Sequence, residues 1–175
     1  PQLKRAPQAL RWRVFAEELG ARLASREPGI DQDIFDAHCE HLVARDDETG
    51  EVVGTYRLLP PEAARRVGSY YAETEFDLTR LRLLRARMVE VGRSCIHPDY
   101  RNGAVIARLW QGIALLMLEY RYRFLIGCAS MGMADGGAFV WESEEGVEAA
   151  WQRITRKYRQ TILERKIRFY VLPGF

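Results

Sequence analysis

Residues 90–103 have the sequence Glu90-Val91-Gly92-Arg93-Ser94-Cys95-Ile96-His97-Pro98-Asp99-Tyr100-Arg101-Asn102-Gly103. The pattern predicts a strand, a sharp turn and the start of an apolar helix. The first turn of a helix has free N–H groups, so this order of elements is typical of a backbone cradle for phosphate. A carboxylate and a guanidinium stand in the strand beside the cradle. The stretch therefore favours acyl or phosphoryl chemistry on a phosphate-bearing carrier.

Working outward, hydrophobic periodicity predicts a mixed α/β fold, with a mostly antiparallel central sheet flanked by helices, in one domain spanning residues 1–175. Proline cannot donate to a strand ladder, so Pro60-Pro61 is expected to end the second strand. Gly92 in the middle of its strand predicts a β-bulge or a close approach to a ligand. The expected helices cover 9–19, 74–85, 104–120 and 144–163. The expected strands cover 41–45, 52–59, 88–96, 124–129 and 167–171, the fourth lying at the centre of the sheet.

Composition excludes several classes of protein. Hydrophobic residues make up 47% of the 175 residues and charged residues 29%, as in soluble globular proteins. No apolar run approaches the ~20 residues of a membrane span, and three cysteines without CxxC spacing fit a reducing cytosol and predict no metal site. We expect a cytoplasmic protein that binds no nucleic acid. The chain begins at Pro1, from which we expect a trimmed sequence.

Charge is unevenly distributed, although the net charge is only +2. Residues 27–51 hold nine acids and one base, and residues 153–168 hold seven bases and one acid. Such asymmetry predicts a docking face for an anionic partner, or else two ordinary solvated faces.

The motifs carry a family resemblance that runs from Arg13 to Ser130. The corner 97–101 and the order of elements resemble the GNAT superfamily of N-acyltransferases. Four stretches look like the signature of acyl-homoserine-lactone synthases, namely Arg13-Val14-Phe15, Asp33-Ile34-Phe35-Asp36, 54–60 and Glu90-x-x-Arg93. Stretches 90–106 and 126–130 look closer still to ornithine lipid N-acyltransferases and long-chain N-acyl amino acid synthases. The chain lacks the long C-terminal extension expected of the ornithine lipid enzymes, which leaves the acceptor amino acid open.

The resemblance implies transfer of a long-chain, or 3-hydroxy, acyl group from acyl-carrier protein to the amine of an amino acid. Acetyl-CoA enzymes of this superfamily usually have glycines at positions occupied here by Ala104 and Ile106. Ile106 would narrow the cradle for a pyrophosphate, whereas a carrier-bound phosphopantetheine presents one phosphate. We therefore expect the phosphopantetheine thioester of acyl-carrier protein as the donor, no permanently bound cofactor, and possible peripheral contact with the inner membrane through the lipid product.

The reaction class assigns expected roles to residues. An amine that attacks a thioester must lose a proton, so Glu90 is the candidate general base, with Arg93 beside it if a bulge brings both to one face. Backbone N–H groups near residues 92–94 are candidates to bind the thioester carbonyl. The expected donor-binding residues are Ser94, Arg101, Asn102, Gly103, Ala104 and Ser130. The expected acceptor-side residues are Arg57, which closes a polar network, and its neighbours Arg13, Asp33 and Asp36.

Other interpretations remain open from sequence. Glu90 and Arg93 also fit a structural ion pair, and Asn102-Gly103 also fits an ordinary turn. An acetyl-CoA-dependent N-acetyltransferase is the alternative enzyme, and a non-catalytic module that binds acyl carriers is the alternative of a different class. Cys128 is expected to be a buried, small apolar residue because no histidine is placed to activate it.

Overall fold

The computed structural model describes residues 2–128 and 167–172, and side chains from Arg5 to Cys128. Five described strands form one sheet in the order β4-β3-β2-β1-β5. They are β1 (Glu40–Asp46), β2 (Val52–Leu59), β3 (Met88–Ile96), β4 (Phe124–Ile126) and β5 (Ile167–Leu172). All neighbours pair antiparallel except β3 and β4, which are parallel. The predicted mixed, mostly antiparallel sheet is confirmed.

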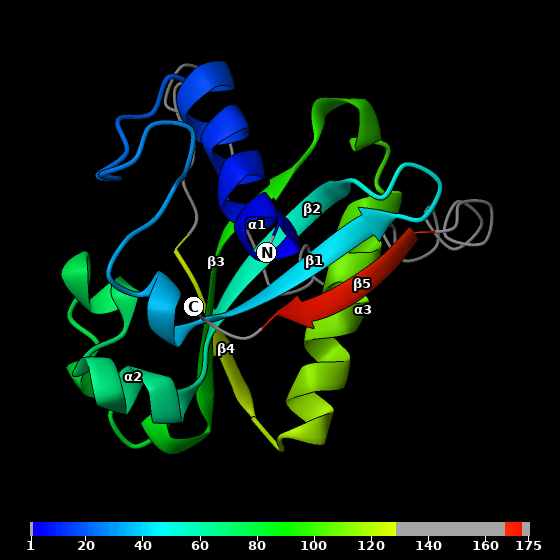
Figure 1. The fold of residues 1–175 in the computed structure, drawn as a ribbon. Coiled ribbons are helices and arrows are strands. Elements are labelled where there is room, and N and C mark those ends of the chain that lie inside the picture. Colours follow the sequence, from blue (N-terminus) through cyan, green and yellow to red (C-terminus); the bar gives the residue numbers. More distant parts are fainter. Residues whose placement is uncertain (1, 129–166, 173–175) are drawn as a thin grey trace, which may run out of the picture.

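Helices cover the sheet on both sides (Figure 1). The helices are α1 (Gln2–Trp12), continued by a π-helical turn (Arg13–Glu18), α2 (Pro61–Val67) and α3 (Ala104–Glu119). Helix α3 packs its apolar stripe, including Val105, Leu109 and Ile113, on Leu42, Leu58 and the β3 valines. Leu10 and Val14 pack with Cys95 in a separate cluster. No helix in the described ranges is long and apolar enough to cross a membrane.

Periodicity located most elements correctly, because alternation and 3.6-residue spacing are local signals. Strands β2 and β3 have the predicted bounds, β1 is longer by one residue at each end, and α3 ends one residue early. The first helix starts earlier than predicted. The helix expected over 144–163 lies outside the described residues.

Two local predictions were wrong. The segment 74–85 is not one helix but belongs to a series of 3₁₀ turns, Tyr71–Thr74, Thr79–Leu81 and Arg85–Arg87. Leu78, Leu81 and Leu84 recur every three residues on the core, a spacing that matches three residues per turn. The prediction that Pro60-Pro61 ends the second strand is confirmed, because β2 ends at Leu59. Pro61 also opens α2, where its missing N–H would be unpaired in any case.

The second wrong prediction concerns β4, which is an outer strand among those described rather than a central one. It pairs with β3 only through Met88–Phe124, Val89–Leu125 and Glu90–Ile126. Beyond Glu90, β3 continues without a partner on that side within the described residues. Gly127 then passes so close to β3 that a Cβ there would collide with the carbonyl oxygen of Val91. The ladder between the two strands therefore ends at the Glu90–Ile126 pair, although Gly127 still lies against Val91.

The predicted bulge is present, but it lies one residue later than Gly92. Gly92 pairs with Arg57 and Cys95 with Thr55, so two residues of β3, Arg93 and Ser94, oppose one residue of β2. Arg93 has φ of 50°, the left-handed region that side chains other than glycine seldom adopt. The extra residue reverses the alternation of β3 beyond the bulge. Arg93 consequently comes to the same side of the sheet as Glu90.

Candidate active site

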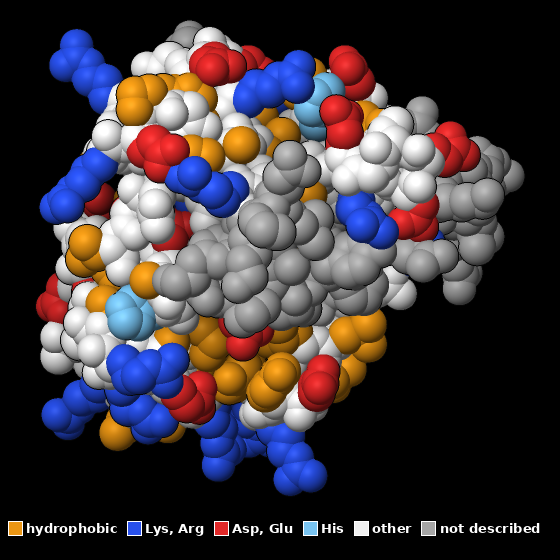
Figure 2. All heavy atoms as spheres, viewed as in Figure 1, with side chains coloured by type: hydrophobic (Ala, Val, Ile, Leu, Met, Phe, Trp, Pro, Cys, Tyr) orange, Lys and Arg blue, Asp and Glu red, His pale blue; other side chains and the backbone are white. Residues whose placement is uncertain are grey.

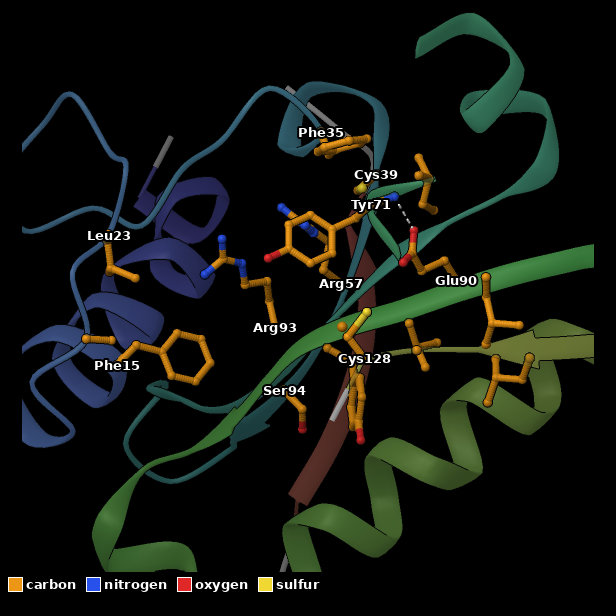
Figure 3. A pocket seen from close by; sticks show the side chains of 18 of the residues that line it. Phe15, Leu23, Phe35, Cys39, Arg57, Tyr71, Glu90, Arg93, Ser94 and Cys128 are labelled. Atoms are coloured by element: carbon orange, nitrogen blue, oxygen red, sulfur yellow. Dashed lines mark hydrogen bonds between the residues drawn. The ribbon is translucent and has the colours of Figure 1, made fainter. Parts of the chain in front are cut away.

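A cavity of about 900 Å³ lies where β3 and β4 part (Figure 3). Most of its wall is apolar or aromatic, with three charged side chains, Glu90, Arg57 and Arg93, on one side. The apolar wall includes Phe15, Leu19, Leu23, Phe35, Tyr56, Leu59, Trp110, Leu125 and Ile126. A largely apolar hollow with a few converging polar groups is typical of a small-molecule site, and its size suits a ligand larger than an acetyl group.

Glu90 is buried, with 5% of its surface exposed. Its two carboxylate oxygens accept hydrogen bonds from the backbone N–H groups of Tyr71 (2.6 Å) and Ala72 (2.7 Å). Burial raises the pKa of Glu90 above its ordinary value, while these N–H groups and the charge of Arg57 act to lower it. Each carboxylate oxygen keeps a lone pair, so the group can still accept a proton.

Arg93 does not pair with Glu90 within the described part of the chain. Its guanidinium lies 3.6 Å from Asp31 and 3.4 Å from Asp33, and its carbon is 5.8 Å from the centre of the Tyr71 ring. The ion pair considered from sequence is therefore absent. Both side chains face one cavity, with Arg93 partly exposed to it (Figure 3).

Arg57 closes a buried polar network, as the resemblance implied. One of its nitrogens lies 2.6 Å from Asp33 and 2.9 Å from Asp36. Burial acts to raise the pKa of Asp33, but the charge and hydrogen bond of Arg57 lower it to about 2. The network fastens the segment before β1 to the sheet beside the cavity.

The sequence interpretation missed Arg11, which is the central cation of this network in place of Arg13. Arg11 is fully buried and contacts Asp31 at 2.8 Å and Asp36 at 2.6 Å. A signal was present, because Arg11 lies three residues before Val14 on the buried stripe of the first helix, where an unpaired charge would be unfavourable. Arg13 points elsewhere, with a guanidinium nitrogen 2.7 Å from Nε2 of His97.

The residues expected to bind the donor phosphate lie at the start of α3 and outside the lining of the cavity. Gly103 adopts φ of 89°, and the Asn102 side chain accepts the N–H of Ala104 at 3.1 Å. Arg101 is bound to Glu18 through both terminal nitrogens. One N–H of the expected cradle is therefore already bonded to Asn102, and the charge of Arg101 is already paired with Glu18. Ser94 lines the cavity, and Ser130 lies outside the described residues.

The cysteines differ from expectation in one respect. Cys128 is exposed rather than buried, and it lines the cavity next to β4. Partial desolvation in the cavity wall nevertheless raises the pKa of the Cys128 thiol, which keeps it protonated at neutral pH. In the described ranges no group of three His, Cys, Asp or Glu residues is placed to hold a metal ion.

The acidic segment is not simply a docking face, because Asp31, Asp33 and Asp36 turn inward to the arginines. The arginines expected on a late helix lie outside the described residues. Figure 2 shows Lys and Arg side chains gathered around the end of the molecule that carries α2. Exposed arginines of that region include Arg65 and Arg66 on α2 and Arg80, Arg82 and Arg87 in the turns that follow it.

The mixed, mostly antiparallel sheet flanked by helices defines a GNAT-like fold. Residues 10–111 match the family described as the acetyltransferase (GNAT) domain, and the chain belongs to this family.

Two relatives are named L-ornithine N(alpha)-acyltransferase. The protein of Rhodobacter capsulatus is 40% identical over 141 residues, which cover 77% of this chain and 54% of the relative. The protein of Brucella abortus is 40% identical over 134 residues, covering 71% of this chain and 48% of the relative. The chain thus spans about half the length of the curated relatives it matches.

Solved structures of acyl-homoserine lactone synthases share the fold. BjaI, described as CoA-dependent and solved with SAM and isopentyl-CoA, superposes with a TM-score of 0.57 at 17% identity, over 87% of this chain and 82% of BjaI. LasI gives a TM-score of 0.55 at 18% identity, over 87% of this chain and 71% of LasI. The predicted fold class is confirmed.

Proposed function

We propose that the chain is an N-acyltransferase that moves a long-chain acyl group from a phosphopantetheine thioester of acyl-carrier protein to the α-amine of an amino acid. The observation that carries the proposal is the place of Glu90. Its buried carboxylate lines a large apolar cavity at the point where β3 and β4 part.

The shape of the site supports a long acyl donor. Among the described residues β3 has no strand partner on this edge beyond Glu90, and its backbone N–H and C=O groups there offer hydrogen bonds to an extended pantetheine arm, in the manner of an added strand. The wall formed by Tyr56, Trp110 and Leu125 offers apolar contact to a chain. Ala104 and Ile106 at the start of α3 favour a single phosphate over a pyrophosphate.

The charged side of the cavity supports an amino acid as acceptor. Arg93 is held more loosely than Arg57, at 3.4 and 3.6 Å against 2.6 and 2.9 Å, and 23% of its side chain is exposed. In the proposal Arg93 binds the α-carboxylate and leaves the amine facing Glu90. The names of the relatives make L-ornithine the first acceptor to test.

The chemistry balances with the side chains at hand. The amine nitrogen forms a bond to the thioester carbon, and the amine proton passes to Glu90, directly or through a water. The carbon–sulfur bond breaks, and the leaving thiolate takes up the proton that Glu90 received, which restores the carboxylate. A raised pKa makes Glu90 a better proton acceptor, and backbone N–H groups of residues 92–94 stabilise the charge that develops on the carbonyl oxygen.

The test is a direct assay of the purified chain. Palmitoyl and 3-hydroxyacyl groups are offered on acyl-carrier protein, on free pantetheine and on CoA, and acetyl-CoA is included. L-ornithine and a panel of other amino acids serve as acceptors, and mass spectrometry identifies the N-acyl product. The expected result is a long-chain N-acyl amino acid formed fastest from the carrier-bound donor.

Each arm of this assay has its own meaning. Preferential use of acetyl-CoA would replace the proposal by an N-acetyltransferase. Equal rates from carrier and CoA would refute the donor, while leaving the transfer in place. Binding of acyl-carrier protein without any turnover, with either donor and any acceptor, would favour a non-catalytic carrier-binding module. In the proposal the enzyme acts in the cytoplasm, with peripheral membrane contact through its lipid product.

A further inference from the structure

The Glu90 carboxylate is held by a turn that contributes nothing else to the cavity wall except Tyr71. This turn, residues 70–74, directs two consecutive backbone N–H groups, those of Tyr71 and Ala72, at the two oxygens of Glu90. Figure 3 shows the bond from Tyr71. Two or three such bonds are enough to lower the pKa of a carboxylate strongly, so the position of the turn affects the proton affinity of Glu90.

Two contacts hold the turn from opposite ends. Tyr70 is buried, and its hydroxyl lies 2.6 Å from the carbonyl oxygen of Met88, two residues before Glu90 on β3. Glu73 accepts the N–H of Tyr70 at 2.7 Å and forms a two-point ion pair with Arg85, whose second contact measures 3.0 Å. Arg85 also lies over the ring of Tyr70, 5.0 Å from its centre.

We propose that the Glu73–Arg85 ion pair is a positioning device that keeps the Tyr71 and Ala72 N–H groups directed at the Glu90 carboxylate. Neither residue lines the cavity, and neither was singled out from sequence. Charge-assisted, two-point pairs combine strength with directional specificity, which suits them to orienting a turn. The role in catalysis rests on the proposed function, because it assumes that Glu90 is the base.

The groups around Glu90 allow the effect of the Glu73–Arg85 pair to be distinguished from the effects of other charges. The described titratable groups that interact electrostatically with Glu90 are Arg57 on β2, Glu73 and Tyr70 of the turn, Cys39 before β1 and Cys128 after β4. Burial raises the pKa of Tyr70 and of Cys39 to about 12, so neither changes charge near neutral pH. Arg57 stays protonated. Among the described groups that act on Glu90, Glu73 is therefore the ionised carboxylate that Arg85 neutralises.

The test measures the pKa of Glu90 itself. The chain is labelled with ¹³C at glutamate carboxyl carbons, the Glu90 signal is assigned with Glu90→Gln, and its titration is followed by NMR. In Arg85→Met we expect the pKa of Glu90 to rise by about half to one pH unit, because the N–H bonds loosen. The acidic limb of the pH profile of kcat/KM should move up by the same amount.

The double variant Glu73→Gln/Arg85→Met separates position from charge. In Arg85→Met the Glu73 carboxylate loses its partner, and its negative charge would raise the pKa of Glu90 by repulsion even if the turn did not move. The double variant has no charge at position 73, so this repulsion is absent. Persistence of most of the shift in the double variant supports positioning. Return of the pKa to the wild-type value would overturn the proposal in favour of simple charge repulsion.

Two further variants control for the general effect of removing an arginine and for a possible failure of Arg85→Met to fold. Arg80→Met changes an exposed arginine of a neighbouring turn and should leave the titration unchanged. Arg85→Lys keeps the charge without the two-point geometry, so we expect a smaller shift in the same direction, and this variant serves if Arg85→Met does not fold. An unchanged pKa of Glu90 in both Arg85 variants refutes the device.

The outcomes also distinguish the device from the proposed function. If the NMR shift occurs but the wild-type chain shows no acyl transfer, positioning of the carboxylate stands and the enzymatic proposal fails. If acyl transfer occurs but substitution of Arg85 changes neither the titration of Glu90 nor the pH profile, the enzymatic proposal stands and the positioning role of Arg85 fails.

Discussion

The buried network gives the strongest test of how the site is assembled, through the substitution Arg11→Met. Arg11 has no exposed surface and bridges Asp31 and Asp36, which lie 20 and 25 residues away in sequence. Methionine keeps much of the volume but removes the charge. Asp36 would retain Arg57 at 2.9 Å, whereas the remaining ion pair of Asp31 among the described residues would be the 3.6 Å contact with Arg93.

The expected cost follows from leaving a buried carboxylate poorly paired. Removing one partner of a buried ion pair destabilises proteins by roughly 3–5 kcal/mol. One guanidinium nitrogen of Arg11, Nη1, has no hydrogen-bond partner among the described residues, so part of its desolvation is uncompensated already. We therefore expect the lower end of the range, about 3 kcal/mol, from a total that is typically 5–15 kcal/mol for one domain.

Urea unfolding of wild type and Arg11→Met, followed by far-ultraviolet circular dichroism, measures this loss. The matched control is Arg5→Met, which removes an exposed arginine paired with the exposed Glu27. Such surface pairs contribute about 0–1 kcal/mol.

Equal, small losses for the two variants would contradict the reasoning, because Arg11 would then behave as a surface residue. A large loss for Arg11→Met alone supports a network that holds the helix and the acidic segment against the sheet.

Three further outcomes are expected. Glu90→Gln should lower kcat by ~10²–10⁴-fold, the usual contribution of a general base, with the circular dichroism spectrum retained. Burial and the charge of Arg11 lower the pKa of His41 to about 4, whereas an unfolded histidine titrates near ~6.5. The unfolded chain therefore binds the proton first, so the free energy of unfolding should decline as pH falls from about 6.5 to about 4, and His41→Gln should weaken that decline. Gly54→Ala should cost roughly 1–3 kcal/mol, since the added methyl group meets Val105 of α3.

Each of these has a matched comparison. Glu75→Gln changes an exposed carboxylate near the site and should keep full turnover; near wild-type turnover of Glu90→Gln would place the base elsewhere. His38→Gln, at an exposed histidine, should leave the pH dependence unchanged. Gly92→Ala, where an added Cβ meets nothing within 4 Å, should unfold at higher urea than Gly54→Ala, and the opposite order would contradict the packing argument.

The candidate site could be predicted where its chemical groups lie close together in the sequence. Glu90 and Arg93 were recognised in one strand, and the bulge that turns them to one side was anticipated from Gly92, one residue from its true place. The assignment of Arg13 to the network was wrong, because two arginines of one helix differ in direction by their place on the helical turn. Only Arg11 lies on the buried stripe.

Alternation and helical periodicity in the sequence determined the identity and bounds of β2, β3 and α3, and with the motifs they determined the family. These signals are local, since each depends on neighbours within two to four residues. The tertiary structure alone decided that β4 is an outer strand, that Arg11 joins Asp31 and Asp36, and that the turn at residues 70–74 holds the carboxylate of Glu90. The reason is that sheet order and buried charge pairing join segments about 20 residues or more apart. Such contacts are selected by the free energy of the whole packed chain, which no local pattern contains.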